Sequence, residues 1–144
     1  MNVNEHFYEC AKITANISGL DAKNIYAQMV HETDNFTNWG ATEANNFGGI
    51  KKFRDQPEWF TGDATSPEGD EYQVFDSPEA FALYYGKYLS LYREDGIYEA
   101  DTLYNLAKAL RHGGYYGNMP GMDESESVDN YEAGLTRAYK EAFL

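Results

Sequence analysis

The hydrophobic and polar positions along the chain predict a mainly helical protein. A first helix is expected over residues 4–17, and Gly19 ends it. Its apolar positions fall on or near one face: Phe7, Cys10, Ala11 and Ile17. Asp21 is typical of a helix N-cap and predicts a second helix to about His31. The inward positions of this helix are Ala22, Ile25 and Met29.

The middle of the chain changes in character. Residues 33–50 are expected to form a loop with one short helical turn at 42–46. Residues 51–76 carry prolines, glycines, several acids and the alternating segment 72–75, which predicts a small irregular or β-hairpin lobe.

The C-terminal half reads as three more helical segments. Ser77-Pro78-Glu79 is a strong helix start, and this helix is expected to continue to about Tyr92. A further helix is predicted from Asp101-Thr102 to about Arg111, followed by a loop over 115–126. The last, over 127–143, is amphipathic, with apolar positions at Tyr131, Leu135, Ala138 and Ala142.

These elements predict one domain over residues 1–144 of the mainly α (α+β) class. The small lobe, about 51–76, is inserted between the second and third long helices. A cleft between two such lobes is a natural ligand site.

Composition narrows the choice of partners. The net charge is 11 − 24 = −13, which disfavours binding to nucleic acid or to an anionic membrane. No apolar run approaches 18 residues, and the N-terminus lacks a secretion signal, so synthesis in the cytoplasm without membrane insertion is expected. The single cysteine, Cys10, excludes an internal disulfide and is interpreted as a buried, inert thiol.

Aromatic residues make up 16% of the chain, including 13 tyrosines. Tyr and Trp rings can stack on sugars, although tyrosines that simply fill half-buried surface are the plainer interpretation.

Glu32 is the main candidate for catalysis. It lies near the C-terminal end of an apolar helix, where the helix dipole disfavours the ionised carboxylate and so raises its pKa. A loop and then the segment 45–51, with an amide pair and a glycine pair, follow it. Such an arrangement can form a sugar-cleaving cleft, because amides bind sugar substituents and glycines allow close approach of the backbone. The alternative is a solvated acid at a helix end.

Other chemistries lack their motifs. A zinc HExxH motif would need a histidine at position 35, which is Asn35, while His6 and His112 are remote in the sequence. There is no phosphate-binding GxxxxGK[ST] loop and no GxSxG. His31 is interpreted as a packing or supporting residue. No metal and no cofactor are expected, and the acidic stretches 63–71 and 123–129 are interpreted as solvated loops.

Four segments together resemble a known family. They are H-E-T-D-N-F, N-N-F-G-G-I-K, V-F-D-S-P-E-A-F and G-G-Y-Y, in that order. Over roughly residues 20–143 the chain resembles the bacterial and phage endo-β-N-acetylglucosaminidase family of the lysozyme-like superfamily, which includes peptidoglycan hydrolases. The resemblance implies a lysozyme-like helical domain with Glu32 as the general acid. It also implies a substrate-binding cleft floor formed by Asn45, Asn46, Phe47, Gly48, Gly49 and Lys51. For Asn46 a turn amide, and for Lys51 a solvated charge, are the alternatives.

The family also has a tyrosine in a G-Y-A-T-D-P loop that faces the reacting sugar. The resemblance assigns this role to Tyr115, with Tyr116 as the second choice; packing on the final helix is the alternative. The A-T-D-P part is absent, because the chain continues as Gly117-Asn118-Met119-Pro120.

A second carboxylate is sometimes attributed to the small lobe in this family. Glu68 is the candidate, with Asp70 and Glu71 as competitors. An inverting mechanism would place the two carboxyl groups about 6.5–9.5 Å apart. In a substrate-assisted mechanism the N-acetyl group of the sugar would attack, and Glu32 alone would be needed.

The resulting hypothesis is a peptidoglycan hydrolase that cleaves the β-1,4 bond after N-acetylglucosamine at the bacterial cell wall. A muramidase or lytic transglycosylase on the same fold, and a non-catalytic structural or wall-binding tail protein, are the alternatives. The net charge of −13 favours a module held in a larger assembly, such as a phage tail with other virion proteins, because a tethered enzyme needs no electrostatic attraction to an anionic wall.

Overall fold

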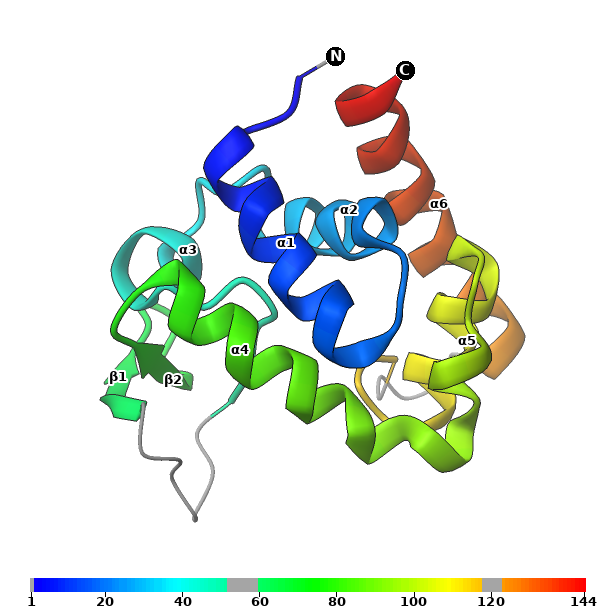
Figure 1. Ribbon diagram of the computed structural model, residues 1–144. Helices are drawn as coiled ribbons and strands as arrows, with labels where there is room; N and C mark the ends of the chain where they lie inside the picture. The colour runs from blue at the N-terminus through cyan, green and yellow to red at the C-terminus, as the bar shows by residue number, and fades with distance from the viewer. Residues whose placement is uncertain (1, 52–59, 118–122) are drawn as a thin grey trace.

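The computed structural model describes residues 2–51, 60–117 and 123–144 and shows a helical body with a small two-stranded lobe (Figure 1). This confirms the predicted mainly α fold with a lobe inserted between the second and third long helices. In chain order the elements are α1 Glu5–Ser18, α2 Ala22–Thr33, α3 Trp39–Ala44, β1 Phe60–Thr65, β2 Glu71–Phe75, α4 Pro78–Tyr88, the 3₁₀ turns η1 Leu89–Asp95 and η2 Ile97–Glu99, α5 Leu103–His112 and α6 Glu124–Phe143.

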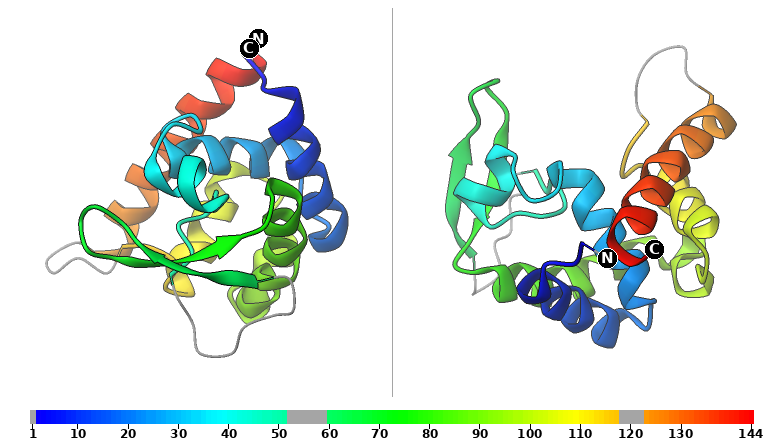
Figure 2. Two further views of the ribbon diagram at one scale, coloured as in Figure 1. Left: turned by 90° about the vertical axis from the view of Figure 1, so that its left-hand side faces the viewer. Right: turned by 90° about the horizontal axis from the view of Figure 1, so that it is seen from above.

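Helix α2 runs through the middle of the helical body, packed against α1 on one side and α6 on the other (Figure 2). Every residue from 24 to 30 is buried. The side chain of Asp21 caps its start by accepting the backbone N–H groups of Lys23 and Asn24, as predicted. Its end is fixed by Asp34, which adopts a left-handed conformation with φ 50°. Glu32, in the last turn, is therefore attached to a rigid element.

The small lobe contains an antiparallel hairpin of β1 and β2, and α3 packs against β2. The side-chain amide of Asn45 donates to the carbonyl of Phe75 at 3.0 Å and so joins the end of α3 to β2. Lys51 forms an isolated bridge with Tyr72 and adds a short piece of chain to the hairpin. The lobe thereby stands beside the C-terminal end of α2.

Aromatic side chains fill the space between the lobe and the helices. Phe47 contacts Phe7, Phe36 and Phe81, and Phe81 contacts Phe75. Cys10 is buried in the same core, as expected. These ring contacts couple the hairpin to α1 and α4.

Several boundaries differ from the sequence-based expectations. The third long helix ends at Tyr88 rather than Tyr92 and continues as 3₁₀ turns, with Tyr92 in a non-helical conformation. The last helix begins at Glu124 rather than 127, because Asp123 caps it by accepting the N–H of Glu126. The short turn expected at 42–46 is the helix α3.

One side chain expected to face inward does not. Ile17 is 41% exposed, although its side chain covers Gly86 of α4. Among the described residues, no helix has both the length and the apolar character needed to cross a membrane.

Candidate active site

A groove runs along both sides of Glu32. Two hollows, each of about 430 Å³, share Glu32 and Gly49 in their walls. The hollow on the side of the small lobe is lined also by Asn38, Trp39, Gly40, Asn46, Ser66, Glu68, Asp70 and Tyr72. The hollow on the side of the helical body is lined also by Gly48, Ile50, Lys51, Tyr88, Tyr92, Gly114, Tyr115 and Tyr116. A chain-like substrate lying in both hollows would pass directly over the Glu32 carboxyl group.

The environment of Glu32 favours its protonated form. Burial raises the pKa of the Glu32 carboxyl group to about 7, and a hydrogen bond from Tyr131 acts in the opposite direction. The Tyr131 hydroxyl donates to Glu32 Oε1 at 2.5 Å. The direction of the pKa shift agrees with the sequence-based expectation, but its main cause is burial in the groove rather than the helix end. At neutral pH a substantial fraction of Glu32 can therefore donate a proton.

A chain of polar side chains fixes the Tyr131 hydroxyl. Gln28 lies one turn before Glu32 on α2, and its Nε2 donates to Tyr131 at 3.4 Å. Gln28 Oε1 in turn accepts the hydroxyl of Tyr85 at 2.8 Å. Tyr116 stacks on the Tyr131 ring, with centroids 3.9 Å apart and planes 13° from parallel. These contacts hold one oxygen of Glu32 and leave Oε2 on the side of Gly49, 3.7 Å from where a Cβ at Gly49 would stand.

The turn 46–50 forms the floor between the two hollows, and the Asn46 side chain holds it. Asn46 Nδ2 donates to the carbonyls of Ile50 at 2.9 Å and Gln73 at 3.0 Å. Its Oδ1 accepts the N–H groups of Ile50 and Gly48. All of these partners are backbone groups. Such contacts are expected for the alternative interpretation, in which Asn46 is a turn amide rather than a substrate ligand. The amide is engaged in shaping the cleft floor in this structure.

Both glycines of this turn occupy positions that a side chain would disturb. A Cβ at Gly48 would lie 3.0 Å from the Tyr115 hydroxyl and 3.2 Å from the Phe81 ring. Gly49 has φ +63°, a conformation that residues with a side chain rarely adopt. Gly49 therefore brings bare backbone to the centre of the groove, whereas Gly48 lets the buried side of the turn pack against Tyr115 and Phe81.

The two candidate tyrosines lie on the wall of the helical body, in the hollow that Gly48 and Gly49 also line. The Tyr115 hydroxyl donates to the carbonyl of Gly48 and so joins the segment after α5 to the cleft floor. The Tyr116 hydroxyl donates to the carbonyl of Ala107 at 2.7 Å. Of the segment that replaces A-T-D-P, Asn118 to Pro120 lie outside the described residues.

The other candidate residues have mixed positions. Phe47 is buried in the core, and Asn45 bonds to β2, so both hold the lobe in place. Lys51 lines the groove with its Nζ 3.2 Å from the Tyr72 hydroxyl and 3.5 Å from Asp70. Glu68 is exposed on the wall of the hollow beside the small lobe, which Glu32 also lines. Its competitor Asp70 is paired with Lys51.

Sequence reasoning missed several residues of the site. Tyr131 was assigned only to the apolar stripe of the last helix, yet it contacts the candidate acid. Gln28 could have been identified from the sequence, because a polar residue one turn before Glu32 lies among apolar positions of the same helix. Trp39 and Tyr72, with ring centroids 5.9 Å apart, form an aromatic wall of the groove.

Comparison with known proteins assigns the family. The family model described as mannosyl-glycoprotein endo-β-N-acetylglucosaminidase matches residues 8–144. The chain belongs to this glucosaminidase family. The predicted resemblance, which placed the match at roughly residues 20–143, is thereby confirmed.

A solved structure supports the fold of this glucosaminidase family member. The crystal structure of a peptidoglycan hydrolase mutant from Sphingomonas sp. A1 superposes with a TM-score of 0.69 at 18% sequence identity. The match covers 95% of this chain and 94% of the other. No curated protein sequence matches the chain significantly.

The first prediction concerns the pH dependence of stability. Because the folded-state pKa of Glu32 is raised from 4.5 to about 7, the folded state binds more protons than the unfolded state between these values. Stability attributable to Glu32 should fall as pH rises through this window and stay low above it. Glu32→Gln should therefore stabilise the protein at pH 8 by an amount on the order of 3 kcal/mol, and have little effect at pH 4.

Denaturant unfolding of both proteins at the two pH values measures this difference. An equal change in the free energy of unfolding at pH 4 and pH 8 would contradict a raised pKa for Glu32.

The second prediction concerns Tyr131. Its hydrogen bond lowers the pKa of Glu32, so Tyr131→Phe should raise that pKa further and move the alkaline limb of kcat/KM to higher pH. Loss of the bond that orients the carboxyl group should also lower kcat by about 10- to 100-fold.

The pH profile of glycoside hydrolysis tests this, with Tyr139→Phe as the control. Tyr139 lies on the same helix and packs against Phe143. Its hydroxyl should therefore not affect the alkaline limb of the kcat/KM profile. An unchanged limb in Tyr131→Phe would show that the hydrogen bond does not tune Glu32.

Proposed function

We propose that this protein is a peptidoglycan hydrolase that cleaves the β-1,4 bond following N-acetylglucosamine. The observation that carries the proposal is the position of Glu32, a carboxyl group with a pKa of about 7 at the centre of an extended groove. Membership of the glucosaminidase family supports the choice of bond, and the similarity to a peptidoglycan hydrolase supports the choice of polymer.

Glu32 acts as the general acid in this mechanism. The protonated carboxyl group donates its proton to the glycosidic oxygen as the bond from that oxygen to the anomeric carbon breaks. Tyr131 holds Oε1, so the carboxyl group is oriented before substrate binds. Positive charge develops on the sugar ring, and water ultimately adds to the anomeric carbon.

The groove offers two routes for that second stage. Glu68 stands on the wall of the hollow shared with Glu32 and can serve as the general base for an attacking water. Alternatively, the N-acetyl group of the substrate attacks the anomeric carbon, and no second carboxylate is needed.

Aromatic rings provide the contacts for neighbouring sugars. The Trp39 and Tyr72 rings line the hollow beside the small lobe, and Tyr88 and Tyr115 line the other. Sugar rings present apolar C–H faces that pack on such aromatic surfaces. The glycan strand therefore has binding surface on both sides of the cleaved bond.

The acidic charge of the chain bears on how it reaches the wall. A net charge of −13 repels an anionic polymer, so we propose that the protein acts at the cell wall as a module of a larger assembly, such as a phage tail. Attachment supplies a high local concentration of enzyme without electrostatic attraction.

The third prediction tests the reaction. Purified peptidoglycan incubated with the wild-type protein should yield glycans that end in N-acetylglucosamine after reduction with borohydride, as identified by mass spectrometry. Glu32→Gln should lose at least about 10²-fold of this activity, because general acid catalysis contributes 10²–10⁴-fold. Its intact thermal transition at pH 5 serves as the control for folding.

The reduced end distinguishes the alternatives. Reduced N-acetylmuramic acid would indicate a muramidase, and an anhydro end would indicate a lytic transglycosylase. Absence of products with several wall types would favour the structural or wall-binding role and contradict the proposal.

The fourth prediction separates the two routes. If Glu68 is the base, Glu68→Gln should lower kcat by about 10²-fold or more. In the substrate-assisted route the loss should be small, and a substrate lacking the N-acetyl group should not be cleaved. Asp76→Asn is a suitable control, because Asp76 is an exposed acid at the end of the hairpin.

A further inference from the structure

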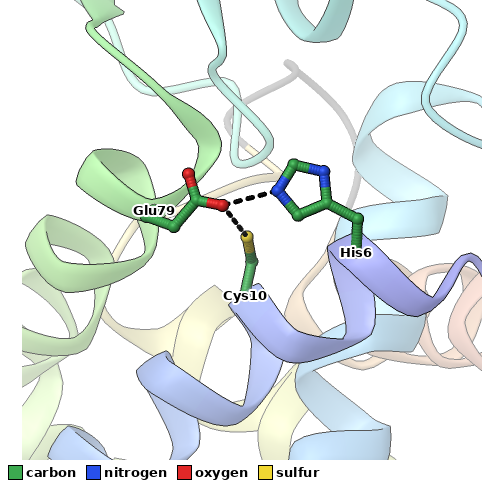
Figure 3. A group of neighbouring side chains, drawn as sticks. All are labelled: His6, Cys10 and Glu79. Carbon is green, nitrogen blue, oxygen red and sulfur yellow. Dashed lines mark hydrogen bonds and ion pairs between the residues drawn. The ribbon is translucent and has the colours of Figure 1, made fainter.

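Three side chains with metal-binding atoms meet at the junction of α1 and α4 (Figure 3). His6 Nε2 lies 2.5 Å from Glu79 Oε1, and Cys10 Sγ lies 3.9 Å from the same oxygen. The three candidate ligand atoms all lie within 4.8 Å of one another. No second group of this kind occurs in the described part of the chain.

The backbone places these side chains together. His6 and Cys10 are four residues apart on α1, one turn apart on the same face. Glu79 is in the first turn of α4, after the N-cap Ser77. One turn beyond Cys10 and Glu79, Thr14 donates to the carbonyl of Ala82 at 2.8 Å and fixes the two helices against each other. The cluster therefore depends on a rigid helix pair.

The donor atoms indicate which ions would bind. A thiolate, an imidazole and a carboxylate suit zinc and neighbouring transition metals, whereas magnesium and calcium prefer oxygen ligands alone. We propose that His6, Cys10 and Glu79 bind a divalent transition-metal ion of the zinc type, with solvent completing its coordination.

Small movements of the exposed side chains would bring the ligand atoms to the spacing that such an ion requires. With zinc bonds of about 2.0–2.3 Å, tetrahedral ligand atoms lie about 3.3–3.6 Å apart. The Cys10–Glu79 separation is within a few tenths of an ångström of this range. His6 and Glu79 must separate by less than about 1 Å, and their side chains, 58% and 47% exposed, have room to move.

Protonation of the cluster in the metal-free protein predicts a pH dependence. Burial and the nearby Glu79 raise the pKa of the Cys10 thiol to about 12, so the sulfur carries a proton. The hydrogen bond from His6 lowers the pKa of Glu79. Metal binding forms the sulfur–metal bond and releases the thiol proton to solvent. Affinity should therefore increase as pH rises.

A simpler interpretation is an exposed His–Glu ion pair above a buried thiol. The chain contains a matched pair for comparison, His112 with Asp95, whose Nδ1 and Oδ1 are also 2.5 Å apart. A metal held only by an exposed histidine and a carboxylate would bind both pairs equally. Cys10 is what distinguishes the proposed site.

Bound metal would connect the start of α1 to the start of α4. Because α4 directly follows β2, the ion would help to hold the small lobe on the helical body. This inference is independent of the proposed hydrolase activity.

Titration of the full chain, without an affinity tag, with Co²⁺ and with Zn²⁺ tests the site. Co²⁺ should produce a thiolate-to-cobalt charge-transfer band that saturates at one ion per chain, and Zn²⁺ should abolish the band. Calorimetry in two buffers of different ionisation enthalpy should detect proton release.

Three variants complete the test. Cys10→Ala should abolish the band, and His6→Ala should weaken Zn²⁺ binding at least about tenfold, since even residues that only support metal ligands affect affinity by 10–100-fold. His112→Ala should leave both unchanged. Absence of the band in the wild-type protein, or Zn²⁺ affinity that Cys10→Ala does not alter, would overturn the proposal; unchanged thermal melts of the metal-free variants establish that they fold.

Discussion

The hydrogen bond between Tyr131 and Glu32 is the contact on which the site depends. It joins the end of α2 to α6 through two residues that are 99 positions apart in the sequence. Burial makes the carboxyl group costly to ionise, while the phenol compensates part of that cost by donating to it. The balance leaves the pKa of Glu32 near neutrality, which suits a group that must both give up and regain a proton.

The rest of the groove is arranged around this carboxyl group by backbone contacts. The amide of Asn46 closes the turn 46–50 on itself and on β2, and Tyr115 holds the same turn from the helical body. Gly49 leaves the backbone bare where the two hollows meet, and Gly48 allows the turn to pack closely against Tyr115 and Phe81. Many residues that resemble substrate ligands in the sequence thus hold the cleft floor, and aromatic rings form much of its walls. In the turn 46–50, some groups hold the shape of the cleft floor, and others face the groove where substrate would lie.

The cleft is suited to contact with a glycan, but the net charge of the protein does not attract it to an anionic wall. An open groove with polar and aromatic walls suits a long stretch of glycan. The surplus of acidic side chains gives no electrostatic attraction to an anionic wall. Both features are compatible in a module that is brought to its substrate by attachment, since the groove then needs to supply only local contacts.

The sequence by itself determined the helical class and the inserted lobe, and it singled out Glu32 as the candidate acid. Helix caps such as Asp21 and Ser77, and the apolar spacing of α2, act through neighbours in the chain, so their patterns are readable locally. The sequence-based prediction missed the Asp123 cap, because the acidic residues around it resemble a solvated loop. Only the tertiary structure decided that Tyr131 contacts Glu32, that Asn46 bonds to backbone, and that His6, Cys10 and Glu79 converge. The contacts of Tyr131 with Glu32, of Asn46 with Gln73 and of Glu79 with the α1 pair join segments far apart in the chain, and they exist only once the helices and the lobe have packed together.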